Sequence, residues 1–283
     1  MIEVKRLHDH FAAEVTGLDL TRPIDDEAFA EVEATFREHS VLIFPNQPLN
    51  DDQQIAFSER FGPLEVTKVG TAGAGSKLII LSNIGPDGEV VALGDRALLN
   101  NKANQHWHAD SSFKVNPAHA SLLSGRVIPA EGGNTEYISM RAVYAELSDE
   151  MKQKIEGLVV IHDFAYGRAK IAPHLVTDEE RKAVPPVRQA MVLDHGAHGK
   201  SLYLGAHAAS VEGLSEREGR ALIDELMAFA SLEKFIYSHK WRQDDVILWD
   251  NRAVVHRATP FPNQEQRRRV VRTTIAGKGP TLN

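Results

Sequence analysis

Short apolar runs recur along the whole chain, and they restrict its fold more than any other feature of the sequence. Residues 41–44 (Val-Leu-Ile-Phe) stand between Ser40 and Pro45 without a polar interruption, which is typical of a buried strand. Short strands that close on themselves favour a barrel or a double-sheet jelly roll. Further strands are predicted within residues 2–20 and at residues 78–81, 89–97, 121–127, 135–139, 158–164, 187–193, 201–204, 235–241, 246–249, 253–258 and 269–276.

Helical periodicity interrupts these runs at several places. The clearest helix covers residues 215–229, where Ser215 and Glu218 form a capping box ahead of an apolar stripe. The expected fold class is therefore mainly β with surrounding helices (α+β). Other predicted helices follow the acidic residues 25–27, run from Asn50 to the Gly-Pro pair at 62–63, and cover residues 144–155, and residues 166–185 are expected to form an insertion over a site.

The composition argues against several kinds of binding partner and metal site. The 283 residues include 0 Cys, so a metal would be held by nitrogen and oxygen, and finger-type structural zinc is excluded. A formal net charge of −7 argues against a nucleic-acid partner. The first residues lack the apolar core of a signal peptide, and no apolar run approaches the ~20 residues of a membrane span. We expect a single cytoplasmic domain over residues 1–283 with no membrane or nucleic-acid partner.

The pair His108 and Asp110 is the strongest candidate for chemistry. In an extended backbone, side chains two residues apart point the same way, so an imidazole and a carboxylate would face one point. Together they form two thirds of the 2-His-1-carboxylate set that holds non-haem Fe(II). The best third ligand is His256, whereas His106 has the same parity as His108 and competes for that place. A surface or hydrogen-bonding role is the alternative for the pair taken alone.

The order of the candidate ligands and two later arginines along the chain is more specific than the ligands alone. The order His108-x-Asp110…His256, followed by Arg268 and Arg272, resembles the taurine dioxygenase family of Fe(II)/2-oxoglutarate oxygenases. The resemblance extends from about residue 41 to residue 275 and implies a double-stranded β-helix, that is, a cupin-like jelly-roll core. Other family-like segments are Trp107, 132–136 and 249–252, while 110–113, 140–142, 205–208 and 211–214 resemble the 2,4-dichlorophenoxyacetate (aryloxyalkanoate) dioxygenase branch.

The resemblance implies a role for each matching residue. His108, Asp110 and His256 would be the catalytic metal ligands for Fe(II), whereas His106 would not bind the metal and would have a structural role or support a ligand. Arg268 would grip the far carboxylate of 2-oxoglutarate, with Arg267 as the alternative register. The remaining implied positions are Thr135 and Trp249 in the 2-oxoglutarate pocket, and Arg272, Asn104, Phe164 and His207 in the substrate pocket. Beside the resemblance, the backbone amides around Ser111 are candidates to assist Arg272, and Lys68 is a candidate second cation for the substrate carboxylate, with a solvated lysine as the alternative.

The implied activity is hydroxylation of the ether-linked carbon of an aryloxyalkanoate such as 2,4-dichlorophenoxyacetate. This oxidoreductase reaction would release a phenol, with succinate and CO2 from 2-oxoglutarate and O2, and would serve herbicide degradation in aromatic catabolism. The same mechanism on a sulfonate or alkyl sulfate ester is the second hypothesis. Residues 63–77 contain no histidine or tyrosine of the kind that taurine enzymes use there. A zinc hydrolase or a non-catalytic metal-binding jelly roll is the third, and a homo-oligomer (dimer, trimer or tetramer) is expected.

Overall fold

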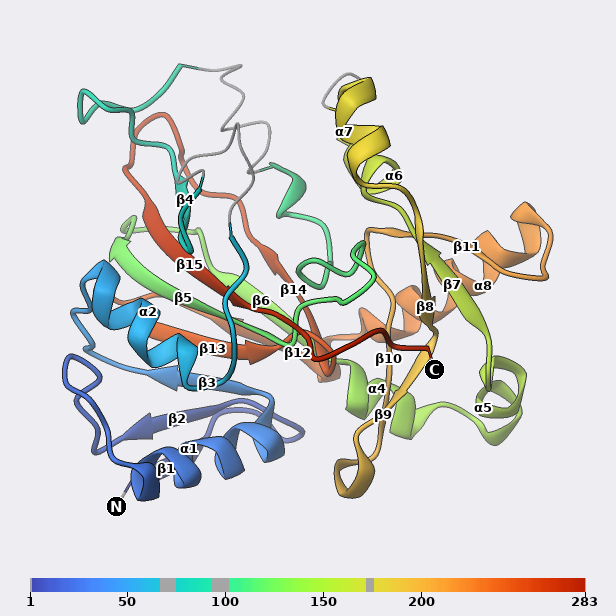
Figure 1. Cartoon of the computed structure of the whole chain (residues 1–283), viewed down its shortest axis with the longest axis horizontal. Helices are drawn as coiled ribbons and strands as arrows, with labels where there is room; N and C mark the ends of the chain where they lie inside the picture. Colours follow the sequence, from blue (N-terminus) through green and yellow to red (C-terminus); the bar gives the residue numbers. More distant parts are fainter. Residues whose placement is uncertain (1, 67–74, 93–101, 172–175, 283) are drawn as a thin grey trace.

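The largest sheet joins both ends of the chain (Figure 1). The computed structural model describes residues 2–66, 75–92, 102–171 and 176–282. In the centre of the sheet, β5 (Ala120–Val127) pairs antiparallel with both β13 (Val246–Asp250) and β15 (Arg269–Ile275). The C-terminal strand therefore lies beside a strand from the middle of the chain. The seven strands lie in the order β1 (Glu3–Arg6), β2 (Ala13–Thr16), β3 (Val41–Phe44), β13 (Val246–Asp250), β5 (Ala120–Val127), β15 (Arg269–Ile275) and β4 (Ile79–Ser82).

A smaller sheet packs against one face of the large one. Side chains such as Ile43, Leu123 and Ile247 from the large sheet meet Tyr137 and Val254 from the small sheet in one buried cluster. Two sheets packed face to face form the predicted jelly-roll core. The small sheet is β12 (Ile236–His239), β6 (Thr135–Ser139) and β14 (Val254–Ala258), and the outer sheets are β11 (Ala208–Val211), β7 (Val159–His162) and β8 (Val187–Ala190), and β9 (Val192–Asp194) with β10 (Lys200–Leu202).

Two N-terminal helices, α1 (Asp26–His39) and α2 (Asp51–Glu59), cover the other face of the large sheet (Figure 1). Alternate residues of β3, Leu42 and Phe44, pack there with Phe36 of α1. The strand is thus buried on both faces, which explains why its sequence is apolar without alternation. The Asn50 capping box predicted for α2 is present.

A long helix in the C-terminal part of the chain packs over a second buried cluster. In α8 (Glu216–Ala230), Leu222 and Leu226 pack against Ile138 and Val160, and the Ser215 capping box is present as predicted. The other helical elements are α4 (Met140–Glu146), α5 (Asp149–Ile155), α6 (Phe164–Ala169), α7 (Asp178–Ala183) and the 3-10 turns η2 (Gly196–His198) and η3 (Glu233–Phe235).

Two predictions of secondary structure are wrong. The single helix at residues 144–155 is broken, because Leu147 is extended and the Ser148 side chain accepts from Met151 N to start a new helix. The single strand at residues 187–193 is divided between β8 and β9, which belong to different sheets. Only the first part of the predicted strand at 89–97 lies in the described residues, and there Val90 forms an isolated bridge with Ile84.

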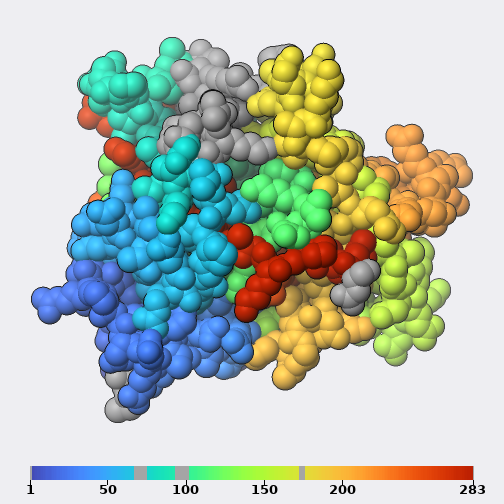
Figure 2. Space-filling model, viewed as in Figure 1, coloured from blue at the N-terminus to red at the C-terminus, as the bar shows by residue number. Residues whose placement is uncertain are grey.

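The C-terminal segment holds distant parts of the chain together. Ala276 N donates to Pro63 O at 2.8 Å, and Thr281 Oγ1 donates to Gln189 Oε1 at 2.6 Å. Figure 2 shows this red segment crossing the surface between the blue N-terminal elements and the gold segment near residue 200. Among the described residues, no helix combines the length and the apolar character that a membrane crossing needs.

Candidate active site

Backbone pairing brings His108 and His256 together. Each amide donates to the other's carbonyl, at 3.0 and 2.8 Å, in an isolated antiparallel bridge. Residues directly opposite in such a pair carry their side chains on the same face. The two imidazole centroids are accordingly 4.2 Å apart, although the residues are 148 positions apart in the sequence (256 minus 108).

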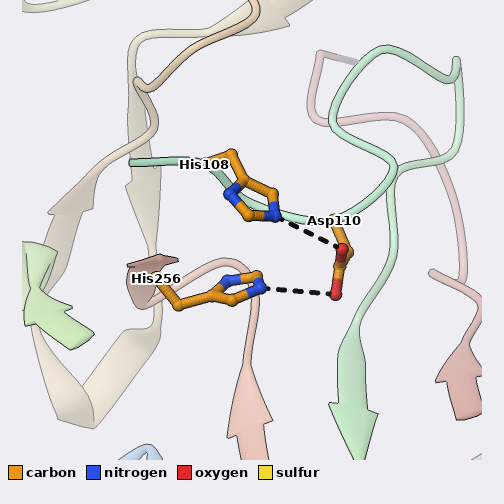
Figure 3. Close-up of side chains that lie close together, drawn as sticks. All are labelled: His108, Asp110 and His256. Carbon is orange, nitrogen blue, oxygen red and sulfur yellow. Dashed lines mark ion pairs between the residues drawn. The ribbon is translucent and has the colours of Figure 1, made fainter. Parts of the chain in front are cut away.

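Asp110 completes a compact set with the two histidines (Figure 3). Its carboxylate oxygens lie 3.9 Å from His108 Nε2 and 3.8 Å from His256 Nε2. One potential ligand atom from each residue lies within 4.8 Å of the others, and all three side chains are buried. The set therefore has the size and donor chemistry of a site for one divalent metal ion.

The protonation states suit a metal. His108 Nδ1 lies 2.8 Å from the carbonyl of His106, which can only accept, so Nδ1 carries the proton and Nε2 keeps its lone pair. Burial lowers the pKa of both His108 and His256, and therefore favours neutral imidazoles. Two neutral nitrogens and one anion form the ligand set that non-haem Fe(II) enzymes use.

The carboxylate of Asp110 is charged in spite of its burial. Burial raises its pKa, but the neighbouring Arg272 guanidinium, the two histidines and the Ser121 hydroxyl together outweigh this effect, and the pKa falls to about 2. Arg272 Nη1 donates directly to Asp110 Oδ1. Ser121 Oγ donates to the other carboxylate oxygen at 2.7 Å.

The parity argument for His106 is wrong. The chain turns at residues 104–106 before it becomes extended, so alternation does not reach that far. The His106 side chain is exposed, and its backbone carbonyl instead orients His108.

A cleft opens beside His108 and His256, and Arg268 lines it. Arg268 is 9% exposed, and burial lowers the pKa of its guanidinium to about 10, so it is charged at neutral pH. Gly133, at φ +66°, leaves room for it, since a Cβ there would lie 3.2 Å from Arg268 Nε. The neighbouring Arg267 points elsewhere and pairs with Glu89 at 2.9 Å. The cleft is lined by His108, His256, Asn104, Thr135, Arg268, Arg272 and residues of β4, β5, β15 and 258–263.

Two buried donors in this cleft lack an acceptor. The Nε atoms of Arg268 and Arg272 have no hydrogen-bond partner among the residues that the structure describes. A buried donor without an acceptor costs about 1–3 kcal/mol, so each position is suited to an anionic ligand. The cleft thus offers two guanidinium groups beside one metal-ligand set.

The Thr135 hydroxyl is oriented by a neighbour. Trp241 Nε1 donates to Thr135 Oγ1 at 2.9 Å, and both side chains are buried. An indole N–H can only donate, so the hydroxyl accepts here and keeps its own proton for another acceptor. Thr135 lines the same cleft as Arg268, where a carboxylate could receive that proton.

Comparison with known proteins decides the family. The family model described as "Taurine catabolism dioxygenase TauD, TfdA family" matches residues 3–274. The chain belongs to this family.

Several relatives match the chain over nearly their whole length. The 2,4-dichlorophenoxyacetate dioxygenase of Cupriavidus pinatubonensis is 39% identical over 275 residues, covering 95% of this chain and 96% of the relative. The (S)-phenoxypropionate/α-ketoglutarate-dioxygenase of Sphingobium herbicidovorans is 34% identical, covering 97% and 95%. The crystal structure of AAD-2 with Mn(II) and N-oxalylglycine superposes with a TM-score of 0.92 at 40% identity, covering 100% and 99%. Like its family, this chain is a 2-oxoglutarate-dependent non-haem iron dioxygenase that uses Fe(II), 2-oxoglutarate and O2.

The other predicted site residues differ in where they lie relative to the cleft beside the metal-ligand set. Asn104 lines the cleft. Trp249 lies behind His256, with the ring centroids 4.6 Å apart, and is not among the described residues that line the cleft. Ser111 uses its hydroxyl to bond Glu65 at 2.8 Å. Lys68 falls outside the described residues.

Phe164 and His207 belong to an aromatic cluster with Phe113. The Phe113 centroid lies 4.9 Å from Phe164 and 4.8 Å from His207. The loop that carries His207 is bonded to the ligand strand, because Ala206 N donates to Trp107 O at 2.7 Å. The cluster therefore lies near His108, and its three members are not among the described residues that line the cleft.

Several residues that support the site were not predicted. Asn83 accepts from Arg268 N at 2.7 Å and so fixes the backbone beside the guanidinium. Ser121 and Asn251 bond Asp110, and Trp241 bonds Thr135. Only Asn251 had a signal in the sequence, since it falls within the family-like segment 249–252, and no local pattern marks the others.

Proposed function

We propose that the protein hydroxylates the ether-linked carbon of an aryloxyalkanoate such as 2,4-dichlorophenoxyacetate, using the site described above. The observation that carries this proposal is the pair of buried guanidinium donors, on Arg268 and Arg272, in the cleft of the His108, Asp110 and His256 set. Two carboxylates must be held in this reaction besides the one on the metal: the far end of 2-oxoglutarate and the head of the substrate. The relatives named for 2,4-dichlorophenoxyacetate and phenoxypropionate support that substrate class.

In this proposal the chain's own residues position the co-substrate. His108, Asp110 and His256 hold Fe(II), which when bound uses O2 to convert 2-oxoglutarate to succinate and CO2 and to insert one oxygen atom into a substrate C–H bond. Arg268 grips the far carboxylate of 2-oxoglutarate with two donors, and the Thr135 hydroxyl gives it a third. Placement within about 1 Å matters, because a misplaced reactant loses on the order of 100-fold in rate.

Arg272 anchors the carboxylate of the aryloxyalkanoate. The guanidinium already donates to Asp110, so the carboxylate that it binds is held beside the metal ligands. We assign the aromatic ring of the substrate to the side of Phe113, Phe164 and His207, with Asn104, the backbone amides near Ser111 and Lys68 as further contacts. Hydroxylation of the ether carbon gives a hemiacetal or hemiketal, which separates into a phenol and an oxo acid.

A sulfonate or alkyl sulfate ester is the second candidate, since one arginine also binds those anions. The relatives named as an alkylsulfatase and a sulfate ester dioxygenase are each 28% identical, further from this chain than the phenoxy-acid enzymes. We therefore favour the carboxylate substrate.

A panel of acids tests the proposed substrate class. Oxygen uptake and succinate release are measured with Fe(II), 2-oxoglutarate and each of 2,4-dichlorophenoxyacetate, both enantiomers of a 2-aryloxypropionate, taurine and a medium-chain alkyl sulfate. We expect one succinate per phenol released from an aryloxyalkanoate. Coupled turnover with the sulfur-containing acids alone would contradict the proposal.

The substitution Trp241→Phe tests how Thr135 is oriented. It removes the indole N–H while keeping an aromatic ring, so the hydroxyl loses its fixed direction. The loss of one neutral hydrogen bond, about 0.5–1.5 kcal/mol, predicts an increase of about 2- to 12-fold in the Kd for 2-oxoglutarate, measured by calorimetry with Mn(II) present. The control Tyr237→Phe removes a hydroxyl that bonds His239 rather than Thr135. An unchanged Kd in Trp241→Phe would argue against the orientation.

The large sheet also bears on the domain organisation of the chain. We propose one domain over residues 1–283, because strands from Glu3 to Ile275 share the seven-stranded sheet. A cytoplasmic location and a homo-oligomeric state stay predictions, the second to be measured by light scattering during size-exclusion chromatography.

A further inference from the structure

We infer that Asn251 is a positioning residue that fixes the carboxylate of Asp110 and the ring of His256 as one unit for the metal. Asn251 lies in the turn between β13 and β14 and is 0% exposed. The inference rests on the proposed metal site, and neither Asn251 nor Ser121 is among the described residues that line the cleft.

The orientation of the Asn251 side chain follows from its neighbours. Its amide oxygen lies 2.9 Å from Trp249 Nε1 and 3.0 Å from Asp110 N. Both of these groups can only donate, so the oxygen must face them. The amide nitrogen is thereby directed to Ser121 Oγ, 2.9 Å away.

This orientation also determines the direction of the Ser121 hydroxyl. Because Ser121 Oγ accepts from Asn251, its own proton is left for Asp110 Oδ2, at 2.7 Å. The bonds run one way, from indole to amide to hydroxyl to carboxylate. Successive bonds in such a chain strengthen one another in a buried site. The Asp110 carboxylate is thus held through both its side chain and its backbone amide.

The other end of the same network supports His256. Trp249, whose indole is held by Asn251, packs on the imidazole of His256 with centroids 4.6 Å apart. His256 Nδ1 has no hydrogen-bond partner among the described residues. Packing against Trp249 therefore contributes to the orientation of the ring.

The turn that carries Asn251 is itself fixed. Asn251 N donates to His119 O at 2.9 Å, and the flanking residues Asp250 and Arg252 form a side-chain pair at 3.1 Å. Asp250 N also donates to Ser40 O at 2.9 Å. The Asn251 amide is therefore held on a fixed turn, from which it bonds the Asp110 backbone, the Trp249 indole and the Ser121 hydroxyl.

Metal affinity, measured without 2-oxoglutarate or substrate, tests this inference. Calorimetric titration with Mn(II) alone is done on the full chain and on Asn251→Leu, Ser121→Ala and the double variant. Loss of residues that support a metal ligand costs about 10- to 100-fold in metal affinity, and we expect a Kd increase of that size in Asn251→Leu and about tenfold in Ser121→Ala. Because Ser121 depends on Asn251 for the direction of its hydroxyl, we expect the double variant to equal Asn251→Leu rather than the product of the two effects.

The matched control is Ser124→Ala, which removes a buried hydroxyl of the same strand that bonds Gln54 and Arg126. Its Mn(II) Kd should stay within about twofold of wild type. Wild-type affinity in folded Asn251→Leu, or fully multiplicative effects in the double variant, would overturn the inference while leaving the metal site intact. If Asn251→Leu does not fold, Ser121→Ala decides by the same criterion. Failure of the wild-type protein to bind Mn(II) would instead overturn the metal site and the inference with it.

Discussion

The substitution Asp110→Asn is expected to raise the Kd for Mn(II) or Fe(II) by at least about 100-fold and to abolish turnover. An amide of the same size replaces the carboxylate of the ligand set, so the anionic ligand is lost. The Arg272 guanidinium also loses the charge to which it donates. Removing one partner of a buried pair typically costs 3–5 kcal/mol, and supporting residues alone already cost 10- to 100-fold in metal affinity.

Asp245→Asn is the matched control for this experiment. Asp245 is equally buried and pairs with His239 and Arg242, away from the cleft. We expect this variant to lower the thermal unfolding midpoint while leaving the metal Kd unchanged. Metal affinity within tenfold of wild type in Asp110→Asn would remove Asp110 from the ligand set.

The substitution Arg268→Met is expected to have the second large effect, on 2-oxoglutarate alone. Methionine keeps the apolar part of the side chain and deletes the guanidinium that faces the cleft. Losing one partner of a buried, charged hydrogen-bonded pair costs about 2–5 kcal/mol, which is about a 30- to 5,000-fold increase in Kd. Calorimetry with Mn(II) present measures it, and the Kd for Mn(II) itself should not change.

The neighbouring arginine provides the control. Arg267 carries the same charge one residue earlier but pairs with Glu89 at the surface. Arg267→Met should therefore leave the Kd for 2-oxoglutarate within about twofold. If Arg267→Met were the more damaging variant, the register assigned to the keto-acid pocket would be wrong.

Local patterns predicted those parts of the fold that depend on local chemistry. The apolar run of β3 and the capping boxes at Asn50 and Ser215 are confirmed, because burial on both faces and helix capping are decided by adjacent residues. The same reasoning failed at Leu147, where the next helix is started by Ser148. It also failed at His106, where the chain turns before it becomes extended.

The site residues also differ in whether local patterns could predict their positions. His108 and Asp110 are two residues apart in one extended segment, and alternation is enough to place them together. His256 was paired with them by the order of residues along the chain, whereas the physical cause is a cross-strand backbone bridge. The supports Asn251 and Trp241 act across more than 100 residues, and no local periodicity reports contacts of that separation.

A crystal structure of this protein with Mn(II), N-oxalylglycine and an aryloxyalkanoate tests the central claim most directly. The account predicts one metal ion held by His108 Nε2, an Asp110 oxygen and His256 Nε2, with the far carboxylate of the analogue on Arg268 and Thr135 and the substrate carboxylate on Arg272. A metal ion bound elsewhere, or an analogue whose far carboxylate avoids Arg268, would contradict it.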